Sequence, residues 1–71
     1  MIREGTEIEW SWGDGKAKGT VKEIHYETIS RKIDGSEVTR HGTDDDPAYV
    51  IEQSDGTRVL KLKSEVSRSD S

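Results

Sequence analysis

The sequence contains no cysteine, no asparagine and no phenylalanine, and Pro47 is its single proline. Without cysteine neither a disulfide framework nor a thiolate metal site can form, and without asparagine there is no acceptor for N-glycosylation. The longest apolar run, Ala48 to Ile51, is far shorter than the ~20 residues of a membrane span, and the first residues lack the apolar stretch of a signal peptide. We therefore expect a soluble, cytoplasmic protein with no membrane association.

The chain is also short of apolar residues. Of its 71 residues 28% are hydrophobic and 37% are charged, and its formal net charge is -4. A chain of this size forms one domain and uses nearly all of its large apolar side chains for the core, which leaves little for a deep pocket. The mild acidity argues against tight non-specific binding of nucleic acid.

The hydrophobic pattern is that of β-strands. Ile8, Trp10 and Trp12 alternate with polar residues, which predicts a first strand over residues 6–12, and the cluster Gly13-Asp14-Gly15 predicts a turn after it. The next segment reads as one long strand over residues 17–28. Its apolar positions change phase between Val21 and Ile24, which predicts a β-bulge or bend near Lys22 and Glu23.

The two Asp-Gly pairs predict two hairpins. If Asp55-Gly56 forms a two-residue type I′ turn, Ile51 faces Leu60 and Tyr49 faces Leu62, with all four side chains on the core face and Val59 outside. The Asp34-Gly35 pair places Lys32 opposite Glu37 and Arg31 opposite Val38. This second hairpin is more polar, and we expect it to protrude from the body of the domain.

The remaining segments are a loop and a tail. Three adjacent aspartates and Pro47 predict a loop over residues 43–47, and residues 63–66 fit one helical turn or a short closing strand. Residues 67–71 have no apolar side chain, so we expect a disordered tail after a domain of residues 1–66. Five strands with one long bent strand predict an all-β fold, a small SH3-like barrel, with an OB-fold as the structural competitor.

Several segments together resemble the hypervirulence-associated TUDOR-like domain family. They are Lys18-Gly19-Thr20-Val21, the Asp34-Gly35 turn with residues 37–42, residues 46–53, residues 55–61 and Lys63-Ser64-Glu65. The resemblance covers about residues 4–66. It implies a TUDOR-like, SH3-like barrel, and it brings no established substrate or catalytic residue.

Four aromatic rings are available for a binding site: Trp10, Trp12, Tyr26 and Tyr49. In TUDOR-like barrels three or four rings can hold a methylated lysine or arginine by cation–π attraction. Core packing is the competing interpretation and is favoured, because these are the largest core-building side chains in the chain. We expect Trp12, beside its turn, and Tyr26, at the end of the bent strand, to be the exposed rings.

Charged residues suggest two surfaces. Arg31, Lys32 and Arg40 on the protruding hairpin would steer an acidic partner toward Trp12 or Tyr26, and these five residues are the candidate partner site. The alternative is a basic stripe that tracks the phosphates of a nucleic acid, and it consists of Lys16, Lys18, Lys22, Arg58, Lys61 and Lys63.

Metal binding and catalysis have weak support. Asp44, Asp45 and Asp46 lack the spacing of a calcium loop, and His25 and His41 have no partners at zinc-site spacing. No nucleophile elbow or phosphate-binding glycine loop is present. We therefore expect no cofactor, no metal and no enzymatic activity, and a non-catalytic module that binds a protein or peptide. Nucleic-acid binding, or a structural or stress-associated role without a ligand, remains the alternative; the partner's identity and the oligomeric state do not follow from the sequence.

Overall fold

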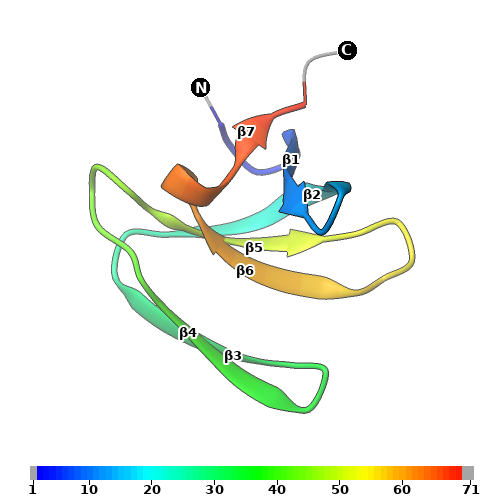
Figure 1. Cartoon of the computed structure of the whole chain (residues 1–71). Helices are drawn as coiled ribbons and strands as arrows, with labels where there is room; N and C mark the ends of the chain where they lie inside the picture. The colour runs from blue at the N-terminus through cyan, green and yellow to red at the C-terminus, as the bar shows by residue number, and fades with distance from the viewer. Residues whose placement is uncertain (1, 70–71) are drawn as a thin grey trace.

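The computed structural model describes residues 2–69, and these form an all-β fold of two antiparallel sheets (Figure 1). One sheet has five strands in the order β6-β5-β2-β1-β7, and the other is the two-stranded β3–β4 hairpin. In chain order the elements are β1 (Glu7–Trp12), β2 (Gly15–His25), β3 (Thr28–Ile33), β4 (Ser36–His41), β5 (Ala48–Glu52), β6 (Arg58–Leu62), the 3-10 turn η1 (Lys63–Glu65) and β7 (Ser67–Arg68).

The first hairpin follows the alternation in the sequence. Ile8 and Trp10 are buried on one face of β1, and a turn at Gly13-Asp14 brings Trp12 opposite Gly15. Gly13 has a φ of 57°, a conformation that glycine adopts without steric cost. This strand and its turn are confirmed to within one residue.

The predicted irregularity of β2 is also confirmed. The pairing of β2 with β5 shifts register between Val21 and Glu23, so that Val21 and Ile24 both face the same core. The long strand is shorter than expected, because β2 ends at His25 and a bend separates it from Thr28, where β3 begins. The bulge thus allows two stretches of β2, whose apolar residues alternate in opposite phase, to face the same core.

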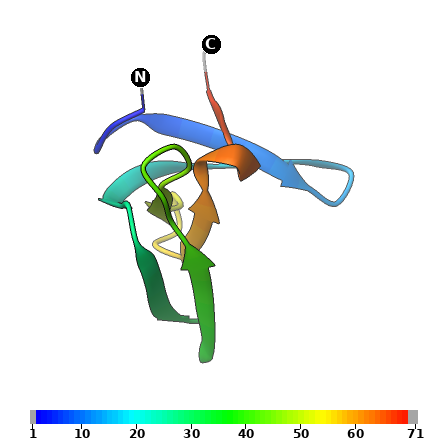
Figure 2. The same cartoon turned by 90° about the vertical axis from the view of Figure 1, so that its left-hand side faces the viewer.

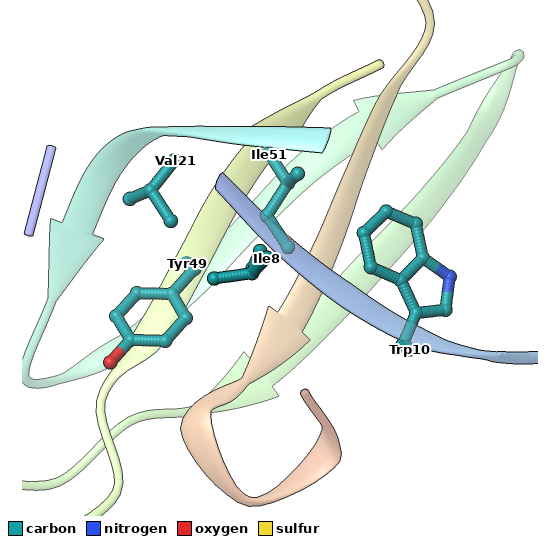
Figure 3. Packing of buried hydrophobic residues seen from close by; sticks show 5 residues of the cluster. All are labelled: Ile8, Trp10, Val21, Tyr49 and Ile51. Atoms are coloured by element: carbon teal, nitrogen blue, oxygen red, sulfur yellow. The ribbon is translucent and has the colours of Figure 1, made fainter. Parts of the chain in front are cut away.

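Strand β5 is buried on both faces, and this organises the whole domain. Tyr49 and Ile51 point into a first core cluster with residues of β1 and β2: Ile8, Trp10 and Val21 (Figure 3). Ala48 and Val50 point the other way, into a second cluster with Ile29 and Leu60. Two cores therefore share one strand, which explains the unbroken apolar run of this segment.

The predicted register of the β5–β6 hairpin is wrong by one residue. Leu60 pairs with Val50, and Val59 pairs with Ile51. The loop is not a two-residue type I′ turn: the Gly56 N–H donates to the carbonyl of Gln53, and within it only Gly56 has a positive φ, of 90°. This is a type I turn followed by a left-handed glycine, which contains one residue more than a type I′ turn.

The β3–β4 hairpin has the predicted register, with Lys32 opposite Glu37 and Arg31 opposite Val38. Asp34 and Gly35 both have a positive φ, as a type I′ turn requires. The hairpin does not simply protrude, because one of its faces packs on the second core cluster through Ile29, Ile33 and Val38. Figure 2 shows it extending below the five-stranded sheet with β6 alongside.

Of the two alternatives predicted for residues 63–66, the helical turn forms, and a short closing strand follows it at Ser67 and Arg68. Residues 63–65 form η1, and Ser67 and Arg68 then pair with Glu9 and Ile8 of β1. Within the segment expected to be a disordered tail, Ser67 and Arg68 thus pair with β1, and residues 70 and 71 lie outside the described residues. Strands β6 and β7 are the two edges of the five-stranded sheet, so within residues 2–69 the sheet does not close into a five-stranded barrel.

Candidate functional site

Among residues 2–69, Trp12 is the most exposed large apolar side chain, with 74% of its surface accessible, whereas Trp10 on the same strand is 6% exposed. The difference arises because β1 continues past the core toward its turn, so that Trp10 is covered and Trp12 is not. An exposed indole beside polar groups provides contact area at low entropic cost and often anchors an interface.

A groove of about 320 Å³, which we call the Trp12 groove, lies beside this ring. Trp10, Ala17 and Val59 form its apolar floor together with Trp12. Its polar rim comes from two turns. Asp34 belongs to the tip of the β3–β4 hairpin, and Gln53 and Thr57 flank the β5–β6 loop. The sequence analysis missed these three residues, because their proximity depends on how the second hairpin docks.

Tyr26, the other exposed aromatic residue, lies far from Trp12. Trp12 pairs with Gly15 at the start of β2, whereas Tyr26 directly follows the end of that strand. Tyr26 is 56% exposed and Tyr49 is buried beside it. The exposure of Trp12 and Tyr26 is thus as predicted, but the four aromatic rings do not converge on one cage.

Arg31 and Arg40 are engaged within the domain. They lie on the inner face of the hairpin, where Arg31 contacts Glu23 at 2.7 Å and Arg40 contacts Glu65 at 3.0 Å. The pKa of Glu23 is lowered, first by its hydrogen bond with His25 and then by Arg31. Arg31 therefore links the hairpin to β2, and Arg40 links it to η1.

Lys32 has a different position. It lies on the outer face of the hairpin opposite Glu37 and is exposed, without an ion pair to any of residues 2–69. Of the five predicted partner-site residues, only Trp12 lines the Trp12 groove.

The basic stripe is broken up by carboxylates. Lys16 contacts Glu9 at 2.7 Å, and Glu52 lies 3.8 Å from Lys22 and 3.5 Å from Arg58. The hydrogen bond from Lys16 also lowers the pKa of Glu9. These three cations of the stripe each have an acidic neighbour, which reduces the positive charge they present to a phosphate.

The remaining members of the stripe, Lys18, Lys61 and Lys63, lie in three different places. Lys18 and Lys22 line a shallow groove that also contains Glu7 and Glu52. Lys63, in η1, lies near the opposite end of the sheet, beside Tyr26 and Asp44. Lys61 is half-buried on β6 opposite Tyr49. The six residues therefore do not form a continuous surface.

The histidines and aspartates do not form a metal site within the described part of the chain. Among residues 2–69 no group of three or more histidine, cysteine, aspartate or glutamate side chains could hold a metal ion. His25 instead contacts Glu23 at 2.8 Å, and His41 bonds to Thr28 at 3.0 Å. The same residues contain no helix long and apolar enough to cross a membrane.

Comparison with known protein families matches residues 5–66 to the TUDOR domain of hypervirulence-associated proteins. The chain belongs to this family. No curated protein and no solved structure matched the chain. TUDOR domains are in general non-catalytic interaction modules that bind protein or peptide partners.

Proposed function

We propose that this TUDOR domain is a non-catalytic interaction module whose Trp12 groove binds an extended segment of a protein partner. The observation that carries the proposal is the 74% exposure of Trp12 over an apolar floor. Burying such a ring against a partner removes apolar area from water, at about 25 cal/mol per Å². The rim of turn residues then orients the segment through hydrogen bonds.

The charge around the groove favours a neutral or basic segment. Asp34 is the charged residue of the lining, and Asp14 lies in the turn directly after Trp12. Arg31 and Arg40, which the sequence suggested would attract an acidic partner, are held by Glu23 and Glu65. We therefore propose that the partner segment carries a large apolar side chain and no acidic cluster.

The test is a selection of binding peptides from a random library on the immobilised domain. The affinity of the selected peptides is then measured by calorimetry at low and high salt. Trp12→Ala should weaken binding at least tenfold at both salt concentrations, as truncation of an anchor residue does. Tyr26→Ala is the matched control, because it removes the other exposed ring, and it should leave the affinity unchanged.

Single-stranded DNA and RNA oligonucleotides are measured in parallel. Nucleic-acid binding would weaken steeply with salt and would depend on Lys18 and Lys22. That result, together with selected peptides that bind the Trp12→Ala variant as well as the parent, would contradict the proposal.

A further inference from the structure

A second groove lies at the end of the sheet opposite Trp12, between the end of β2 and the 43–47 loop, and its volume is about 330 Å³. Ile24 and Pro47 form its apolar wall, and two tyrosine rings meet there. Tyr26 is 56% exposed, whereas Tyr49 is 2% exposed. We call this surface the Tyr26–Tyr49 groove.

The hydroxyl of Tyr49 has no protein partner. Its ring belongs to the first core cluster, and Figure 3 shows the hydroxyl pointing away from Ile8 and Ile51. Nevertheless it makes no hydrogen bond to any of residues 2–69, and the residue lines the groove. Burial raises the pKa of Tyr49, and Tyr26 and Asp46 raise it further, so the phenol stays protonated at neutral pH. Among residues 2–69 no side-chain oxygen shielded from solvent lacks a hydrogen bond, so the Tyr49 hydroxyl is accessible from the groove, where a polar ligand atom can replace water as its partner.

The three aspartates of the loop have two different roles. Asp46 is used by the fold, since its carboxylate accepts hydrogen bonds from the N–H and the hydroxyl of Ser64, both at 2.8 Å. Asp44 and Asp45 line the groove, and their carboxylates have no hydrogen bond or ion pair with residues 2–69. Lys63 contributes one positive charge to the same lining, which leaves the groove acidic and rich in acceptors.

We propose that the Tyr26–Tyr49 groove binds the guanidinium group of an unmodified arginine side chain on a protein partner. A guanidinium is planar and carries five N–H donors, which suit two carboxylates and a phenol oxygen, and its face stacks on an exposed ring such as Tyr26. A lysine ammonium has three donors and no face to stack. This inference stands on a site separate from the Trp12 groove and does not depend on it.

The experiment is an NMR titration of the ¹⁵N-labelled domain with acetyl-Gly-Arg-Gly-amide. The same peptide with citrulline, which has the shape of arginine without its charge, is the ligand control. Shifts confined to the amides around Tyr26, Asp44 and Asp45, and absent with citrulline, are expected. Absent shifts, equal shifts with citrulline, or shifts at the Trp12 end would overturn the proposal.

Variants separate the contacts. Tyr49→Phe keeps the buried ring and removes only its oxygen, and it should weaken binding about tenfold. The double variant Asp44→Asn/Asp45→Asn should weaken it about fivefold, while Lys63→Gln should strengthen it about threefold. Asp34→Asn, which neutralises a carboxylate in the other groove, and Trp12→Ala should leave binding unchanged. Parental affinity in both Tyr49→Phe and the double variant would refute the assignment.

A final ligand tests the requirement for N–H donors. Dimethylation of the guanidinium removes donors while it keeps the charge, so a dimethylarginine peptide should bind more weakly than the arginine peptide. Tighter binding of the dimethylated peptide would show that rings, and not hydrogen bonds, recognise the cation, and would overturn the proposal for unmodified arginine.

Discussion

Gly19 of β2 lies so close to Ile51 of β5 that a Cβ atom on Gly19 would fall 2.5 Å from the Cγ2 atom of Ile51. The carbonyl oxygen of Glu52 would lie 3.0 Å from this added Cβ atom. One neighbour is a fully buried side chain and the other is backbone, so neither can move without disturbing the first core. Glycine is therefore required here for lack of space.

Gly19→Ala should destabilise the domain by roughly 1–3 kcal/mol, which is the cost of overpacking a core. Gly15→Ala is the matched control, because Gly15 lies on the same strand with nothing within 4 Å of its added Cβ, and it should change stability by less than about 0.5 kcal/mol. Urea denaturation measures both. Equal stabilities of the two variants would show that the approach of β2 to β5 is looser than described.

At position 56 glycine is required by the backbone conformation and not by lack of space. Its φ is 90° and nothing lies within 4 Å of an added Cβ. Gly56→Ala should cost about 1 kcal/mol, while Gly56→Asn should cost less, because asparagine tolerates left-handed backbone better. Thermal unfolding of both variants tests this. An alanine variant as stable as the parent would contradict the turn geometry.

The two tryptophans should respond in opposite ways to truncation. Trp10→Ala opens a cavity in the first core and should cost roughly 3–5 kcal/mol. Trp12→Ala removes an exposed ring and should change stability by less than about 0.5 kcal/mol. Fluorescence gives an independent check, since a Trp12→Phe protein should emit at shorter wavelength than a Trp10→Phe protein. Similar emission from both would contradict their different burial.

Glu65 should make stability depend on pH. Partial burial acts to raise its pKa, but the Leu62 N–H, at 2.8 Å, and Arg40 lower it below the ordinary value of 4.5. A carboxyl whose pKa is lower in the folded state stabilises the fold above its unfolded pKa and loses this contribution as the pH falls through the folded value. The stabilisation should therefore be complete above about pH 4.5 and decline below it.

Glu65→Gln should reduce this loss of stability in acid, and hydrogen exchange in the β3–β4 hairpin should become faster, because Arg40 no longer has its anionic partner. Glu37→Gln, on the outer face of the hairpin, is the control and should change neither. The prediction fails if both variants show the parental slope of stability against pH.

The sequence predicted the two Asp-Gly hairpins with different success for a physical reason. At Asp34-Gly35 the type I′ turn alone sets the register, and the prediction is confirmed. At Asp55-Gly56 the predicted register followed from the same two-residue turn, which does not form there, and the supporting argument assumed that only one face of β5 is buried. Val50 and Ile51 are both buried, on opposite faces, so hydrophobicity could not distinguish two registers one residue apart. The unbroken apolar run of β5 was the feature of the sequence that indicated burial of both faces.

The candidate site was predicted in part. Alternation and proximity to a turn were sufficient to expect an exposed Trp12. The position of Asp34 beside it, and the use of Arg31 and Arg40 as internal ties, depend on the docking of one sheet on another. Such contacts join residues far apart in sequence, and a local periodicity contains no information about them.

The pairing of Ile8 with Arg68 brings the first and last strands of the domain side by side at one edge of its sheet. Because the start of β1 lies beside the end of β7, the domain can be joined through these two strands to a single surface loop of a host protein without opening either core. The same adjacency allows the ends to be linked and the chain to be cut at the exposed β5–β6 loop. Such a circular permutant should retain both hydrophobic clusters but lose part of the polar rim of the Trp12 groove, because Gln53 and Thr57 flank the cut.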